Sequence, residues 1–114
     1  MPSKSAGFPV YDIRADPARL KRESLGPLFT RLTVGLTPTT LDANWRRAYE
    51  LITSESDRFA RFTLDAEKAV VLMTCRASES ATEIQTLLQR LDLLLELANL
   101  RATMVAASKQ SDTA

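Results

Sequence analysis

Three stretches of the chain predict β-strands, one because apolar residues recur at every second position and two because β-prone residues are concentrated in them. In the segment 28–36, aliphatic residues recur at nearly every second position, which is typical of a strand with one buried face. Residues 58–64 and 69–76 are two further β-prone runs, and the polar residues 65–68 join them. The two runs therefore predict a hairpin with a four-residue loop.

The same period of two predicts which side chains of this hairpin face the core. The inward face consists of Ala60, Phe62, Leu64, Val71, Met73 and Cys75. Arg61 and Thr63 are expected to face outward. In this position Cys75 is expected to be a small buried hydrophobe and not a nucleophile, because reactive thiols need an accessible, electropositive environment.

A short helix is predicted ahead of the first strand. Asp16 followed by Pro17 is typical of a helix start, because aspartate accepts hydrogen bonds at the N-cap and proline suits the first helical position. Gly26 with Pro27 is typical of a helix end. These residues predict a helix over 17–25.

A second helix is predicted over 40–54, after Pro38 has ended the strand. Thr39 and Asp42 form a variant of the capping box at its start. Its apolar residues recur at steps of three and four, as expected for a helix with one buried face. They are Leu41, Trp45, Ala48 and Ile52. Trp45, the single tryptophan, is expected to be largely buried.

A long helix is predicted over 81–106, where Ser80 and Glu83 form a capping box and neither glycine nor proline interrupts the chain. One apolar stripe of this helix is wide enough to cover a sheet. It consists of Ile84, Leu87, Leu88, Leu91, Leu94, Leu95, Ala98, Ala102 and Val105. A second apolar stripe lies on nearly the opposite side of the helix and consists of Leu93, Leu97, Leu100 and Met104.

A helix with two apolar faces is expected to have two neighbours. Either an N-terminal helix or arm of the same chain covers the second stripe, or another molecule does. The flanks of the stripe are polar. Asp92, Glu96, Asn99 and Thr103 line one edge, and Arg90 and Arg101 line the other. If two such helices pack antiparallel about a twofold axis, Arg90 and Arg101 are expected at the rim, paired with Asp92 or Glu96 of the second helix.

The elements together predict an α+β domain in the order α-β-α-β-β-α, with a small antiparallel sheet of about three strands packed against the long C-terminal helix. Residues 1–15 lack a sustained period and predict a flexible N-terminal arm. The single α+β domain is expected to occupy 16–106, and a disordered tail 107–114.

Composition narrows the function. With 114 residues and 45% hydrophobic side chains, the chain can bury one core without disulfides or metal. It has no histidine and a single cysteine, which removes the usual general base and the common metal-ligand sets. Its glycines form no phosphate-binding loop. Asp65 and Glu67 are better explained by the turn than by acid–base chemistry. No catalytic, cofactor-binding or metal-binding residue is predicted, although a small enzyme of unrecognised type stays a third hypothesis.

A second hypothesis is a nucleic-acid-associated regulator. Residues 1–38 contain six basic and three acidic side chains, so this arm has a charge of +3. Arg58, Arg61 and Arg76, with Phe59 among them, could line one strand face, which is one arrangement that binds single-stranded nucleic acid, although an exposed sheet face kept soluble by charge is the favoured interpretation. The net charge of the whole chain is only +1, and Asp57 and Asp65 offset the arginines, so nucleic acid is the less favoured partner.

The order of motifs resembles the bacterial sensory-transduction-regulator family (YbjN-like), whose fold is shared with type III secretion chaperones. The matching segments are LFTRLTVGL (28–36), DRFARFTLD (57–65), AVVLMTCRA (69–77) and LLQRLDLLLELAN (87–99). The resemblance implies a dimeric, non-enzymatic helper or regulator that binds a partner protein, and it implies no catalytic residue.

The sequence therefore predicts a non-enzymatic protein-binding module, chaperone-like or regulatory, that acts as a homodimer. The expected partner is another polypeptide, with no membrane and no small-molecule substrate. A cytoplasmic location is expected because a single cysteine forms no intramolecular disulfide and no signal-peptide-like run begins the chain.

Overall fold

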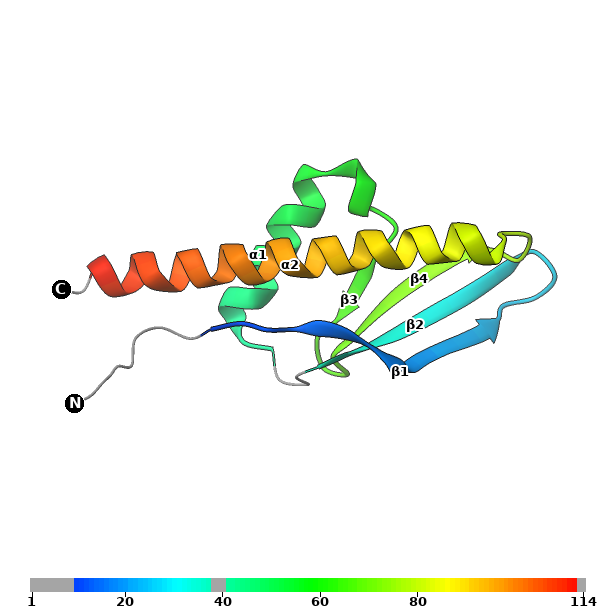
Figure 1. The fold of residues 1–114 in the computed structure, drawn as a ribbon, viewed down its shortest axis with the longest axis horizontal. Helices are drawn as coiled ribbons and strands as arrows, with labels where there is room; N and C mark the ends of the chain where they lie inside the picture. Colours follow the sequence, from blue (N-terminus) through cyan, green and yellow to red (C-terminus); the bar gives the residue numbers. More distant parts are fainter. Residues whose placement is uncertain (1–9, 38–40, 113–114) are drawn as a thin grey trace.

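A computed structural model describes residues 10–37 and 41–112 of the chain. Its elements, in chain order, are β1 (Arg14–Ser24), β2 (Phe29–Thr37), α1 (Ala43–Glu55), the 3-10 turn η1 (Asp57–Phe59), β3 (Thr63–Asp65), β4 (Val70–Arg76) and α2 (Ala81–Asp112). The strands form one antiparallel sheet in the order β1-β2-β4-β3 (Figure 1). The predicted α+β class is confirmed, but the described sheet has four strands and the element order begins with two strands.

The helix predicted over 17–25 is wrong, because this segment belongs to strand β1. The Asp16 carboxylate does accept a backbone hydrogen bond, from Ala18 N at 3.0 Å, but the bond closes a turn inside an irregular strand. The pairing with β2 is regular from Leu20 to Ser24 and shifts between Ala15 and Leu20. The segment has too few apolar residues for a packed helix, so pairing with the neighbouring strand decides its structure.

The first strand of the predicted hairpin is shorter than expected. Only Thr63–Asp65 pairs with β4, and the residues before it form η1 and a turn. Phe59 is therefore buried, whereas Ala60, which was expected to face inward, is exposed. A helical turn directs neighbouring side chains differently from a strand, so the period of two does not apply before Phe62.

Helix α1 begins at Ala43 with Asp42 as its N-cap, and the Asp42 Oδ1 atom accepts a hydrogen bond from Trp45 N at 2.8 Å. Thr39, the other residue of the predicted capping pair, lies outside the described residues. Trp45 is fully buried, as predicted, and its ring stacks on Tyr49 with a centroid distance of 5.5 Å. Helix α1 packs against α2 (Figure 1), and its stripe residues Trp45, Ala48 and Ile52 belong to the buried core.

Helix α2 starts as predicted, with the Ser80 hydroxyl accepting a hydrogen bond from Glu83 N at 3.3 Å. It continues to Asp112, so residues 107–112 of the predicted disordered tail are helical. The predicted arm also differs within its described part. Ile13 is buried, and β1 already begins at Arg14.

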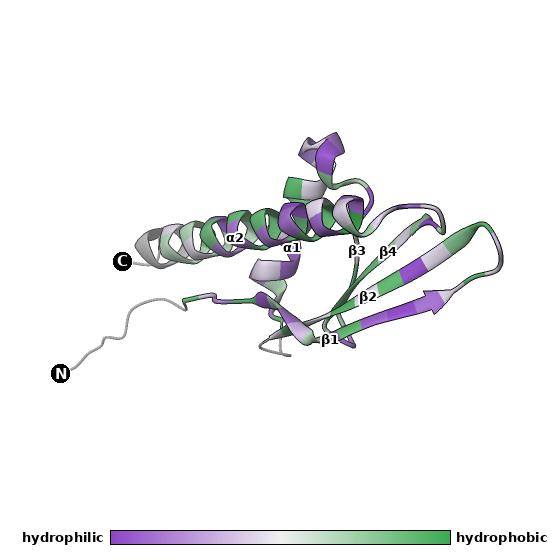
Figure 2. Cartoon of the chain, turned by 45° about the vertical axis from the view of Figure 1, so that its right-hand side comes forward, coloured by the Kyte–Doolittle hydropathy of each residue, from purple (hydrophilic) through white to green (hydrophobic). Residues whose placement is uncertain are grey.

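The core lies between the sheet and the two helices, which are on the same side of the sheet (Figure 2). The sheet contributes alternate residues of β2 and β4. These are Leu32, Val34, Leu36, Val71, Met73 and Cys75. Helix α2 contributes most of its first stripe, with Leu91, Leu94, Ala98 and Ala102 fully buried. One predicted stripe thus covers the sheet and α1, which leaves the second stripe on the opposite side of α2.

Asn99 connects three parts of the fold. Its side-chain oxygen accepts a hydrogen bond from Trp45 Nε1 at 2.7 Å and one from Ile13 N at 3.3 Å. Its side-chain nitrogen donates to the carbonyl oxygen of Ile13 at 3.1 Å. A single amide therefore fixes the start of the sheet to both helices.

Candidate interaction surface

The second apolar stripe of α2 is open to solvent. Leu93 and Leu97 are 43% and 39% exposed, and Leu100 and Met104 are 60% and 62% exposed. The sequence predicted an N-terminal helix that could cover these four side chains. The structure instead has strand β1 in that segment, at the edge of the sheet. Within the described residues, therefore, no other element of the chain buries the stripe.

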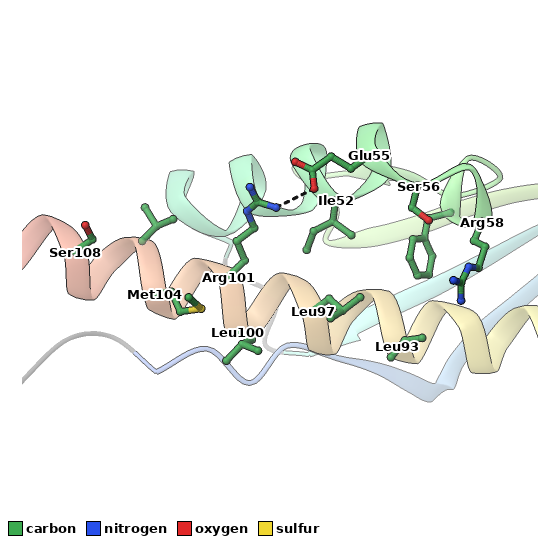
Figure 3. Close-up of a pocket in the computed structure, with 12 residues that line it drawn as sticks. Ile52, Glu55, Ser56, Arg58, Leu93, Leu97, Leu100, Arg101, Met104 and Ser108 are labelled. Carbon is green, nitrogen blue, oxygen red and sulfur yellow. Dashed lines mark hydrogen bonds and ion pairs between the residues drawn. The ribbon is translucent and has the colours of Figure 1, made fainter.

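A groove runs beside this stripe, between α2 and the segment formed by the end of α1 and η1 (Figure 3). Its volume is about 710 Å³. Ile52 and Phe59 form its far wall, and the four stripe residues form its near side. The surface is therefore an apolar ridge next to an apolar groove.

Charged residues lie at the edges of the groove. Arg101 reaches across from α2 and donates a hydrogen bond to the Glu55 carboxylate of α1, with a distance of 3.1 Å between Nη1 and Oε2 (Figure 3). Arg58 lies on η1 at the end near Leu93 (Figure 3). Arg90, predicted at the rim, is exposed on α2 one turn before Leu93.

The acidic flank of the stripe faces a different part of the molecule. Asp92 and Glu96 line a hollow together with Ile13, Arg14 and Asn99, on the side of the N-terminal segment. Desolvation by burial raises the pKa of Asp92, and the nearby charge of Glu96 raises it further. The arginine flank and the acidic flank are therefore on opposite sides of the ridge.

The arginine-bearing strand face of the nucleic-acid hypothesis does not form. Arg58 lies on η1 and not on a strand, and Phe59 is buried in the core. Arg61 is paired with Glu79, with 2.9 Å between Nη2 and Oε1. An aromatic ring that is 4% exposed offers no stacking surface to a base. Arg76 alone of these residues stays exposed on a strand.

The sheet face turned away from the helices carries charges of both signs. A hollow on this face is lined by Lys21, Arg31 and Lys68 and also by Glu23 and Asp65. Arg31 and Glu23 are 3.6 Å apart. Neighbouring charges of opposite sign weaken the long-range field that attracts a polyanion.

Cys75 lies in the core, 2% exposed and without a disulfide partner. Burial raises the pKa of its thiol, and the neighbouring Glu79 raises it further. The pKa of Glu79 is itself lowered, chiefly by the hydrogen bond from Arg61. A buried thiol with a raised pKa holds little thiolate at neutral pH, so it is a poor nucleophile.

We expect Cys75 to react slowly with a thiol reagent in the native protein and rapidly after unfolding, as measured by the rate of colour release from an aromatic disulfide. Cys75→Ala should cost about 1 kcal/mol of unfolding free energy. Rapid stoichiometric labelling of the folded chain would contradict the assignment of Cys75 to the core.

The described residues contain no cluster of histidine, cysteine, aspartate and glutamate side chains that could hold a metal ion. None of the helices within 10–37 and 41–112 has the length and apolar character needed to cross a membrane. Comparisons of the chain with protein-family models, with curated proteins and with solved structures find no match. The site itself is therefore the basis for assigning a function.

The sequence predicted the ridge on α2 but not the groove beside it. The four stripe residues follow from helical periodicity, and the structure groups them on one exposed face of α2. Ile52, Glu55, Arg58 and Phe59 were not predicted at this surface. They reach it because α1 packs across α2 and η1 replaces part of a strand, and neither arrangement has a local signal in the sequence.

Proposed function

We propose that this protein is a non-enzymatic protein-binding module, chaperone-like or regulatory, that acts as a homodimer in the cytoplasm and binds another polypeptide. The observation that supports the proposal is the exposed apolar stripe Leu93, Leu97, Leu100 and Met104, which lies beside an apolar groove of about 710 Å³. Contiguous apolar surface with polar edges is a feature of protein interaction sites. The cytoplasmic location rests on the single free cysteine.

Burial of the stripe would favour association. Each of the four side chains contributes roughly 1.5–3 kcal/mol when it is fully buried, before the cost of association is subtracted. They are already partly buried, with 39–62% of each exposed, so about half of that gain is left for association. The four side chains are contiguous over three turns of α2, so one partner can bury all of them together.

The chaperone-like or regulatory role is proposed from the pattern-level resemblance to the YbjN-like family and to type III secretion chaperones. The same resemblance implies dimerisation and a protein partner. It agrees with an apolar surface on the C-terminal helix.

Leu97→Asp combined with Leu100→Asp is expected to convert a dimer into a folded monomer, because two desolvated carboxylates cannot be accommodated in an apolar contact. Sedimentation equilibrium should show at least a tenfold weaker self-association, which corresponds to about 1.4 kcal/mol. Circular dichroism should show an unchanged helix content.

The matched control is Gln85→Asp with Gln89→Asp, which adds the same charges at exposed positions of α2 outside the stripe. This control should sediment like the wild type. A stripe variant that unfolds would show that the stripe belongs to the intrachain core, and a stripe variant that stays dimeric would contradict the proposed surface.

Partner binding is tested by affinity purification from the native host with the tagged wild-type chain and the stripe variant side by side. A protein that the wild type retains at high salt, and that the variant loses, supports the protein-binding role once its direct binding is reconstituted from purified components. Retention of nucleic acid that falls steeply with salt and does not depend on the stripe would favour the nucleic-acid hypothesis instead.

A further inference from the structure

A second group of exposed apolar side chains lies at the turn between β1 and β2, next to the loop that leads into α2 (Figure 1). Leu25, Leu28 and Phe29 are 40%, 69% and 46% exposed. Leu28 is thus more exposed than any residue of the ridge on α2. We call residues 25–29 the tip. The proposed protein-binding surface does not include it.

Hydrogen bonds fix the backbone of the tip. Leu25 N donates to the carbonyl oxygen of Phe29 at 3.0 Å, and Gly26 N donates to the Ser24 hydroxyl at 3.4 Å. Pro27 has no backbone N–H group. The first three residues of the tip therefore have no unsatisfied backbone donor, which lowers the cost of moving them out of water.

Arginine side chains lie directly behind the tip. Arg76 of β4 is the cross-strand partner of Phe29, and Arg31 is the next residue of β2 on the same face of the sheet. Arg22 lies on β1, three residues or about 10 Å before the first residue of the tip. The apolar tip is therefore bordered by cations on three strands.

The acidic residues near these arginines offset them only in part. Glu23 lies 3.6 Å from Arg31, and Glu79 is paired with Arg61 at 2.9 Å. Within residues 10–37 and 41–112, neither Arg22 nor Arg76 forms an ion pair with a carboxylate. The base of the tip therefore keeps a net positive charge.

The size and chemistry of the tip favour a lipid surface over other partners. Three part-exposed side chains cannot supply the about 800 Å² that a stable protein interface buries on each partner. Single-stranded nucleic acid stacks on aromatic rings, and two of the three side chains are leucines. A lipid leaflet can close around a small apolar tip, and its anionic headgroups attract the cations behind the tip.

We propose that the tip enters the surface of a membrane that contains anionic lipids, with Arg22 and Arg76 at the level of the headgroup phosphates. Apolar groups bound at a membrane surface lie about 5–10 Å deep, which matches the spacing of about 10 Å between Arg22 and the tip. The long arginine side chains can extend toward the phosphates. The contact enters one leaflet and needs no membrane-spanning helix. It departs from the sequence-based expectation of no membrane partner.

Cosedimentation of the full chain with vesicles tests the apolar part of the proposal. The vesicles contain phosphatidylcholine alone or phosphatidylcholine mixed with phosphatidylglycerol. The wild type should bind the mixed vesicles at least about tenfold more tightly than the neutral ones. Leu25→Ser with Leu28→Ser, at two positions outside the strands, should weaken binding to the mixed vesicles at least about tenfold. Val10→Ser, at another exposed apolar residue, should bind like the wild type.

A second pair of variants tests the cations. Arg22→Gln with Arg76→Gln should weaken binding to the mixed vesicles by about tenfold or more and leave the weak binding to neutral vesicles unchanged. Arg46→Gln with Arg47→Gln removes the same charge from exposed positions of α1 and should have a much smaller effect. Circular dichroism checks that every variant is folded.

A fluorescent label tests whether the tip enters the lipid. Leu28→Cys and Val10→Cys are prepared in a Cys75→Ala background and labelled with a nitrobenzoxadiazole dye, whose emission shifts to shorter wavelength in an apolar environment. Mixed vesicles should shift the emission of the label at position 28 and leave that of the label at position 10 unchanged.

The contrary outcomes are distinct. A wild-type chain that does not bind the mixed vesicles would overturn the proposal. Binding that is insensitive to the two serine substitutions, or a label at position 28 that stays in water, would show adsorption by charge alone and would overturn the insertion of the tip. A protein partner that the wild type binds and the serine variant loses, without vesicle binding, would assign the tip to a protein contact instead. None of these results depends on the stripe of α2, so the proposed function is judged separately by its own experiments.

Discussion

Trp45→Ala is expected to lower the free energy of unfolding by about 3–5 kcal/mol, which is the usual cost of truncating a large buried aromatic residue. The Trp45 side chain is fully buried, stacks on Tyr49 and donates a hydrogen bond to Asn99. Its loss leaves a cavity where α1 and α2 meet, and the surrounding backbone can close such a cavity only in part. Urea unfolding followed by circular dichroism measures the effect.

Arg47→Ala is the control for this substitution, because Arg47 is an exposed residue on the same helix. It should change the stability by less than about 0.5 kcal/mol. Similar midpoints for Trp45→Ala and the wild type would show that the helices do not pack through this side chain. The wild-type tryptophan emission should also shift to longer wavelength on unfolding.

Asn99→Leu is expected to cost at least about 2 kcal/mol, although leucine has a similar size. The substitution leaves two donors without their acceptor, Trp45 Nε1 and Ile13 N. An unsatisfied buried donor costs about 1–3 kcal/mol. Glu96→Gln, on the same flank of α2 but exposed, provides a control with little expected effect.

The hydrogen bond between Trp45 and Asn99 couples the effects of substitutions at these two residues. Trp45→Phe removes the indole donor. In this background Asn99→Leu therefore leaves one donor fewer without an acceptor. The double variant should therefore be more stable than the sum of the single effects implies. Simple additivity in the same unfolding experiment would show that the bond between Trp45 Nε1 and Asn99 contributes little.

The sequence predicted correctly those elements whose structure depends mainly on their own residues. The period of two in 28–36 identified β2, and the Ser80 cap with an uninterrupted apolar repeat identified α2. The two-sided character of α2 was also visible, because the side on which a residue lies follows from helical geometry alone. These patterns are local, so no knowledge of the neighbours was needed.

Elements that depend on a neighbour were missed. The Asp16–Pro17 pair is compatible with a helix start and with an irregular edge strand, and only the pairing with β2 distinguishes them. The role of Asn99 was equally hidden. Its position on the polar flank was clear from the sequence, but its bonds to Ile13 and Trp45 join residues that are far apart in the chain.

Strand β1 also affects how the molecule behaves when it is crowded. It forms one edge of the sheet, and an unprotected edge can pair with strands of other molecules and start fibrillar aggregates. Pro17 has no backbone donor, the register is irregular between Ala15 and Leu20, and exposed charged side chains occupy 21–23. Only a short length of this edge could pair with a foreign strand. These features make edge-to-edge pairing of β1 with strands of other copies unfavourable when the protein is concentrated.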